Sequence, residues 1–285
     1  MKASSTMPQA EELDRERHAW SARADRYATY AVPKNTPFAA DLVRLSGVQS
    51  GSRVLDVAAG PGVVAIAAGK ITGVTGTVLA TDLVPAWAPF VERAAFDAGI
   101  PAIPFAAMPG DDLALDDAAF DIVLCQFGLM FMPDPLACLR EMRRVLVPGG
   151  TLGVAVWSTP DKVAHFTAMR ALRQIIGEPP ASPDAPKSSP LSMGKPGLIE
   201  GLVAEAGFTD RCVHRVTHTF RLDDPREEWA RMIEEETFAT AVAAMSPAER
   251  EDAERTVIAC LEQYRVGDHL MLPSEAIMVI AHRPR

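Results

Sequence analysis

The chain alternates between short apolar runs and longer segments with apolar residues at helical spacing, most regularly between residues 50 and 160. Short apolar runs with few charges are typical of parallel strands that are buried on both faces. Apolar residues three or four positions apart, as at Leu136, Leu139 and Met142, are typical of helices with one buried face. The pattern predicts strands at 54–57, 77–82, 104–107, 121–126, 151–157, 209–220 and 274–282, and helices at 8–30, 37–45, from 63, 135–146, 163–176, 196–206 and, as two helices broken at Ser246-Pro247, 225–264. Such alternation predicts an α/β fold.

One acidic residue stands inside the first strand. Residues 54–57 read as a fully buried strand, and Asp56 is costly to bury there unless a polar group meets it. Gly60 and Gly62 follow, and glycine lets the backbone turn tightly and come close to a ligand. The helix that starts at Val63 directs its first N–H groups toward that turn. A strand, a bare turn and a helix start therefore predict a nucleotide-type cleft.

The glycine spacing fits two families. Gly60, Gly62 and Ala65 satisfy the loose dinucleotide fingerprint, and Asp82 lies about twenty residues further on, as that fingerprint requires. The whole stretch resembles more closely the first motif of class I S-adenosylmethionine-dependent methyltransferases. In that family an acid in the first strand lies near the amino-acid end of the cofactor. A dinucleotide strand usually lacks this acid, because the pyrophosphate is itself negative.

The resemblance continues in the family's order over about residues 50–160. A second strand ends in Asp82, a fourth strand covers 121–126, and the segment 139–150 looks like the helix and turn before the family's fifth strand. The resemblance implies a seven-stranded, Rossmann-like, mostly parallel sheet flanked by helices, with an antiparallel last strand and helical lid insertions. It implies S-adenosylmethionine as cofactor, bound at its methionine moiety by Asp56, Gly60 and Gly62, at its ribose by Asp82, and near its sulfonium by Cys125 and Gln126. Ala58 and Leu83 are further predicted cofactor contacts.

The loop after the third strand departs from the family pattern. Relatives usually carry an Asp-Ala pair there that reads the adenine ring, and those places fall on Pro109 and Gly110. Asp111 or Asp112 could accept the adenine amino group, or the Gly110 N–H could read the ring alone. Both aspartates could equally be solvated loop charges.

Composition and charge restrict the partners. The 285 residues carry a formal net charge of −9, and the Arg143-Arg144 pair is expected on the solvent side of its helix. Because nucleic-acid binding needs a basic face, we expect a small-molecule substrate and no nucleic acid. No apolar run is long enough to cross a bilayer, and the polar N-terminus predicts no signal peptide. Four cysteines without paired spacing predict free thiols, a cytoplasmic protein and no metal site.

The segments outside the central pattern predict covers over the cleft. We expect an N-terminal helical cover at 1–47, and a methyltransferase domain at 48–285 with lid elements at about 160–197 and 224–268, the first including a proline-rich surface loop. Tyr27, Tyr30, Phe127 and Trp157 are the predicted substrate contacts.

Methyl transfer by in-line displacement depends mostly on positioning and on excluding water, and an oxygen acceptor also needs a base. His165, just past the fifth strand, is the predicted base. The predicted activity is therefore methyl transfer to oxygen, nitrogen or carbon of a small molecule. An NAD(P)-dependent oxidoreductase and a non-catalytic, cofactor-binding partner subunit stay open as alternatives, and a homodimer is compatible with the sequence.

Overall fold

The computed structural model describes residues 9–177, 189–234 and 236–285, so most of the proline-rich loop lies outside the described residues. The chain divides into two compact units. We call the described parts of Met1–Trp157, Ser188–Val216 and Ala276–Arg285 the sheet unit. We call the described parts of Ser158–Lys187 and Thr217–Glu275 the helical unit.

The sheet has the predicted arrangement. Its strands lie in the order β3-β2-β1-β4-β5-β8-β6; the pairs from β3 to β5 are parallel, and β8 is antiparallel to β5. A short eighth strand, β7, pairs with β8 and was not predicted. The strands are β1 Arg53–Val57, β2 Thr77–Asp82, β3 Phe105–Ala107, β4 Phe120–Gln126, β5 Leu146–Trp157, β6 Thr209–Leu222, β7 Arg265–Val266 and β8 His269–His282. The mostly parallel, Rossmann-like sheet with an antiparallel last strand is thereby confirmed.

Helices of the sheet unit follow the strands. The central strand β1 is buried at four of its five positions, as its apolar run predicts. The helices are α1 Gln9–Leu45, α2 Val63–Thr72, α3 Ala88–Asp97, α4 Pro135–Val145 and α6 Leu198–Glu205, with 3-10 turns η1 Gly73–Thr75, η2 Pro85–Trp87 and η3 Leu129–Phe131.

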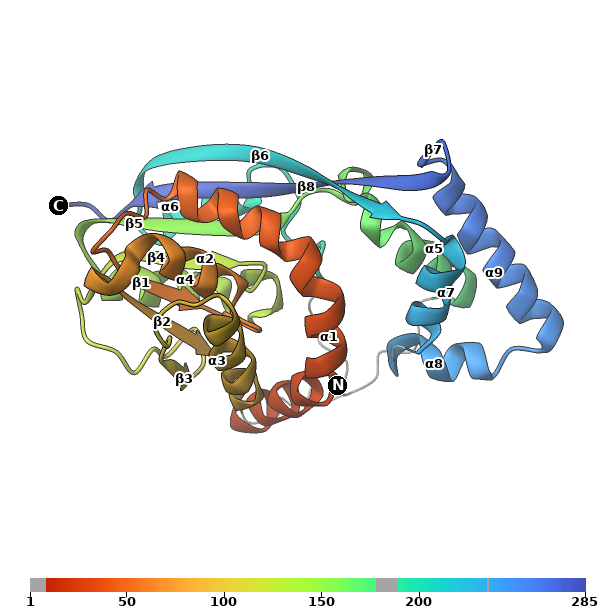
Figure 1. Cartoon of the computed structure of the whole chain (residues 1–285), viewed down its shortest axis with the longest axis horizontal. Helices are drawn as coiled ribbons and strands as arrows, with labels where there is room; N and C mark the ends of the chain where they lie inside the picture. The colour runs from red at the N-terminus through yellow and green to blue at the C-terminus, as the bar shows by residue number, and fades with distance from the viewer. Residues whose placement is uncertain (1–8, 178–188, 235) are drawn as a thin grey trace, which may run out of the picture. The chain divides into compact units, whose positions relative to one another are not determined.

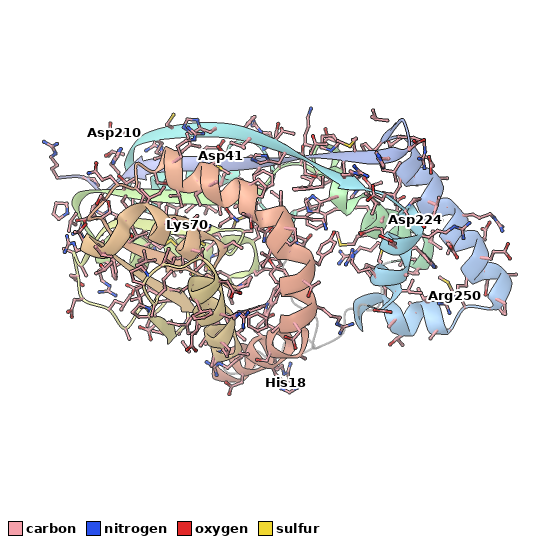
Figure 2. The ribbon with its side chains drawn as sticks, viewed as in Figure 1. His18, Asp41, Lys70, Asp210, Asp224 and Arg250 are labelled. Atoms are coloured by element: carbon pink, nitrogen blue, oxygen red, sulfur yellow. The ribbon has the colours of Figure 1, made fainter. Side chains whose placement is uncertain are left out.

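The N-terminal segment forms one helix, where two were predicted. Figure 1 shows α1 as a single long, bent helix, and Figure 2 labels His18 and Asp41 on its two halves. Pro33 and Pro37 lie inside it, and each removes a backbone donor. The apolar side chains of one face that follows, such as Phe38 and Leu42, are completely buried, so tertiary packing outweighs the local cost of the prolines.

The helical unit has its own apolar core, which includes Trp229, Phe238 and Val257. The predicted break at Ser246 is confirmed, because Ser246 and Glu249 form a reciprocal capping box. The preceding segment was predicted as one helix and is two. Glu234 directly follows α7, and an acidic side chain is unfavourable at a helix C-terminus, which agrees with one helix ending at Ile233 and the next beginning at Glu236. The elements are η4 Pro160–Lys162, η5 Ala164–Phe166, α5 Thr167–Ile176, α7 Pro225–Ile233, α8 Glu236–Ala243 and α9 Pro247–Glu262.

Candidate functional site

The turn after β1 lies at the carboxyl edge of the sheet and has a strained backbone. Ala58 has φ 56° and Gly60 has φ 51°, both in the left-handed region that a side chain disfavours. The Ala59 N–H donates to the Thr81 carbonyl at 2.9 Å, which fixes the turn against β2. A non-glycine residue held in this conformation requires support from its surroundings, and such residues concentrate at functional sites.

The two glycines of the turn have different roles. Nothing lies within 4 Å of the position a Cβ would take on Gly60, so that backbone is open. A Cβ on Gly62 would meet Val91 Cγ2 at 3.0 Å, so Gly62 lets α2 pack closely on α3. The close approach predicted for a ligand therefore belongs to Gly60, and Gly62 serves packing between helices.

Asp56 anchors the start of α2. Its side chain is 1% exposed, and Oδ2 accepts a hydrogen bond from the Ala65 N–H at 2.9 Å. This bond partly offsets the cost of burying the acid. Burial nevertheless raises the pKa of Asp56 well above its ordinary value, and the nearby Asp82 raises it further.

Asp82, at the end of β2, is held by two backbone donors. Its Oδ2 accepts from the Gly60 N–H at 2.9 Å, and its Oδ1 accepts from the Val84 N–H at 3.0 Å. Burial raises the pKa of Asp82 to about 6, although these bonds act in the opposite direction. Each carboxylate oxygen can accept more than one bond, so both stay able to receive a ligand hydroxyl.

The turn after β4 meets the turn after β1. Phe127 has φ 57°, again in the left-handed region. A Cβ on Gly128 would lie 2.5 Å from the Ala58 Cβ, so only glycine allows this approach. The Phe127 ring stacks on Trp157, with centroids 3.9 Å apart. The two strained turns therefore support each other above an aromatic layer.

Gln126 presents a buried acceptor. Its Nε2 donates to the Asn35 carbonyl of α1 at 3.1 Å, which fixes the amide. Its Oε1 is buried and has no hydrogen-bond partner among the described residues, and the residue is 8% exposed. A buried polar atom without a partner costs free energy, so the side chain is suited to a ligand donor.

Helix α1 forms one wall of the site. Tyr27 makes edge contacts with Trp20 at 5.3 Å and with Trp87 at 5.9 Å, and Trp20 contacts Phe131 in the same way. Burial raises the pKa of the Tyr27 hydroxyl, while a hydrogen bond with the Asn35 side chain acts to lower it.

These groups surround one cavity of the sheet unit. Its empty volume is about 1260 Å³ counted to its open mouth, which is ample for a nucleoside-sized ligand. Four of its lining residues are acids, and no lysine, arginine or histidine occurs among the described residues that line it. The lining acids are Glu16, Asp56, Asp82 and Asp111. The cavity therefore favours a positively charged ligand.

Most predicted site residues line this cavity, and the others are not part of its lining. The lining includes Tyr27, Asp56, Ala58, Gly60, Asp82, Leu83, Gly110, Asp111, Gln126 and Phe127, and it does not include Tyr30, Gly62, Cys125, Trp157 or Asp112. Cys125 is completely buried, and burial raises the pKa of its thiol to about 12. The Lys34 ammonium lies over the ring of Tyr30, with Nζ 3.3 Å from the ring centroid.

His165 belongs to the helical unit. It lies in η5, is 5% exposed, and its Nδ1 lies 2.7 Å from Ser274 Oγ. Its backbone N–H also donates to Ser274 Oγ at 3.2 Å. The catalytic role of His165 stays a prediction.

Sequence reasoning predicted Tyr27 on the α1 side of the cavity but missed Leu13, Glu16 and Trp20. Leu13, Glu16, Trp20 and Tyr27 all line it, and their spacings of three, four and seven place them on one helix face. That periodicity was visible in the sequence. Asn35 also lines the cavity, but its contact with Gln126 joins positions 91 residues apart, and no local signal announces it.

No group of three or more metal-binding side chains occurs within the described ranges. None of the described helices combines the length and apolarity that a membrane span requires.

Comparison with known proteins agrees with this geometry. A model of the ubiE/COQ5 methyltransferase family matches residues 36–174. An uncharacterized protein of Mycobacterium tuberculosis is 34% identical over 180 residues, which are 63% of this chain and 62% of that protein. The demethylmenaquinone methyltransferase of Bacillus subtilis is 30% identical over 183 residues, which are 61% of this chain and 78% of that protein. A phosphoethanolamine N-methyltransferase 2 of Haemonchus contortus, solved with phosphomonomethylethanolamine and S-adenosylhomocysteine, has a TM-score of 0.56 at 17% identity and covers 98% of this chain and 61% of its own.

The fold and the matches define the class of the protein as a class I S-adenosylmethionine-dependent methyltransferase. Within that class, the chain belongs to the ubiE/COQ5 methyltransferase family. The match spans 62% of the length of the mycobacterial relative.

Proposed function

We propose that the protein transfers a methyl group from S-adenosylmethionine to a small-molecule acceptor. The observation that carries the proposal is a cavity at the carboxyl ends of β1 and β2, in which every charged residue among the described lining residues is acidic. S-adenosylmethionine supplies a sulfonium, from which a methyl group leaves by in-line displacement. A positively charged ligand is attracted to this lining, whereas the pyrophosphate of a dinucleotide is repelled.

The roles of individual residues follow from their contacts. Asp82, held by two backbone N–H groups, is oriented to accept from ribose hydroxyls. Gln126 Oε1 is oriented to accept from a donor of the cofactor. The open backbone at Gly60 admits the methionine moiety, and Gly110 and Asp111 line the side proposed for adenine.

The acceptor is proposed to be small and apolar, and methylated on oxygen, nitrogen or carbon. Aromatic side chains in the lining, among them Trp20, Trp87 and Phe131, suit a planar ring. The name of the Bacillus subtilis relative refers to a quinone-type substrate, which makes quinones the first acceptors to assay.

The partner and location predictions remain proposals with their own support. The net charge of −9 opposes nucleic-acid binding. The scattered cysteines, of which Cys125 and Cys138 are buried and free, are compatible with a cytoplasmic protein. A homodimer is tested by light scattering after gel filtration.

A ligand titration tests the function. S-adenosylhomocysteine and S-adenosylmethionine should raise the melting temperature and give saturable binding heats, and NAD and NADP should give neither. The Gln126→Met variant should bind S-adenosylhomocysteine about tenfold more weakly, the cost of one lost hydrogen bond to a charged group. Binding of NAD in preference to S-adenosylhomocysteine would overturn the proposal in favour of the oxidoreductase. Cofactor binding without methylation of any acceptor would favour the silent partner subunit.

A further inference from the structure

Arg144 points at the loop after β3, not at solvent as predicted from the sequence. Its Nη2 donates to the Leu113 carbonyl at 2.7 Å, and its Nη1 donates to the Leu115 carbonyl at 2.8 Å and to Asp117 Oδ1 at 2.6 Å. The side chain is 31% exposed. The guanidinium of α4 therefore holds three successive points of that loop.

Glu141 completes the contact one helical turn earlier. Its Oε1 accepts from Arg144 Nε and its Oε2 accepts from Arg144 Nη2, both at 2.8 Å. The same Oε2 accepts from the Leu113 N–H at 3.0 Å. Both polar groups of the Leu113 backbone are thus held by one ion pair, and we call Arg144 and Glu141 the loop clamp.

The clamped loop continues directly into the cavity wall. The four residues 108–111 line the cavity. The Met108 N–H donates to the Asp82 carbonyl at 2.8 Å, so this segment is fixed to β2 at one end and to the clamp at the other. A Cβ on Gly110 would lie 2.9 Å from Met132 Cε, so the segment also packs tightly from the side.

Resting on the proposed function, we propose that Arg144 and Glu141 are positioning residues that hold segment 108–111 in the conformation that reads the adenine ring. The usual Asp-Ala pair is replaced by Pro109-Gly110. Recognition therefore depends on Asp111 and on the Gly110 backbone, which the clamp keeps in place from only two residues away. The planar fork of arginine matters, because a lysine ammonium cannot serve both carbonyls and the carboxylate with the same geometry.

Base selectivity separates this role from a merely structural one. The two probes are S-adenosylhomocysteine and S-inosylhomocysteine, which carries an oxo group in place of the adenine amino group. The unmodified protein should prefer the adenosyl compound by roughly tenfold, the worth of one hydrogen bond to a charged acceptor. Arg144→Lys should lose most of this preference by binding the adenosyl compound more weakly. The matched control is Arg140→Lys, an exposed position of the same helix, which should keep the preference.

Isothermal titration of both probes against the three proteins decides the matter. A preference that Arg144→Lys leaves unchanged, or an equal loss of affinity for both probes, would overturn the clamp and leave the proposed function standing. An unmodified protein that binds neither probe would overturn both. If Arg144→Lys does not fold, Glu141→Gln carries the same test, because it keeps one acceptor oxygen for Arg144.

Discussion

The carboxylate of Asp82 accepts a hydrogen bond from the Gly60 N–H at 2.9 Å, across a sequence separation of 22 residues. This bond joins the end of β2 to the glycine turn that follows β1. The bond fixes the orientation of the Asp82 carboxylate in the cavity. The site is therefore organised before any ligand arrives, which reduces the ordering cost of binding.

Asp82→Ala should weaken cofactor binding by about 1.5–3 kcal/mol, because it removes charge-assisted hydrogen bonds to the ribose. Titration calorimetry with S-adenosylhomocysteine measures the loss. Asp97→Ala, at an exposed position of α3, is the control and should bind normally. Binding heats of the Asp82 variant that match the unmodified protein would contradict the assignment.

Affinity for S-adenosylmethionine should rise between pH 5 and pH 7. The pKa of Asp82 is about 6, so the carboxylate that is proposed to accept the ribose hydroxyls forms within this window. The gain should approach tenfold per pH unit below the pKa and level off above it. Asp82→Asn should bind equally weakly throughout. If Asp82→Asn kept the pH dependence, the titrating group would be a residue other than Asp82.

The raised pKa of Asp82 also affects the stability of the ligand-free protein, which should fall as the pH rises, whereas cofactor affinity should rise. A carboxyl whose folded-state pKa lies above its unfolded value stabilises the fold fully below about pH 4, and this stabilisation is lost as the pH rises through about 6. Compared with Asp82→Asn, the unmodified protein should therefore lose roughly 2–3 kcal/mol of unfolding free energy between pH 4 and pH 7. Urea denaturation of both proteins at each pH measures the difference in unfolding free energy. A difference that stays constant with pH would contradict the raised pKa of Asp82.

Gly128→Ala should destabilise the fold by about 1–3 kcal/mol and weaken cofactor binding, because the new methyl group would lie 2.5 Å from the Ala58 Cβ. Gly201→Ala is the matched control. Gly201 lies in α6 with open space around it, so alanine there should stabilise by about 0.5–1 kcal/mol. Thermal unfolding compares the two, and equal effects would show that the close approach of the turns is not tight.

His165→Ala should lower turnover without weakening cofactor binding, provided that His165 is the base. Since the imidazole is buried against Ser274, the variant's melting temperature must be measured first. Ser274→Ala serves as the control, because it keeps the imidazole and removes its partner. Turnover of the His165 variant equal to that of the unmodified protein, with the acceptor found in a metabolite screen, would remove His165 from the mechanism.

The sequence predicted the parts of the site that depend on neighbouring residues. The strand, the turn and the helix around Asp56 are all encoded within a short stretch, because burial, glycine freedom and the helix start are local properties. The continuity of α1 through Pro33 was not predictable in this way. It depends on burial against elements that come later in the chain.

The orientation of Arg144 could not be predicted for a similar reason. On its helix an arginine looks like an ordinary charged outer residue, and only the return of the chain at Leu113 gives its guanidinium partners. The cavity wall formed by α1 was predictable only in part. The spacing of Trp20 and Tyr27 was readable, but the strand ends they face were not.

On the proposed function, the acidic lining of the cavity has a consequence for the step that follows methyl transfer. When the methyl group departs, the sulfonium becomes an uncharged thioether, and the carboxylates lose the cation that they attract most directly. On the proposed function, the spent nucleoside should therefore be attracted less strongly by the carboxylates than the fresh one.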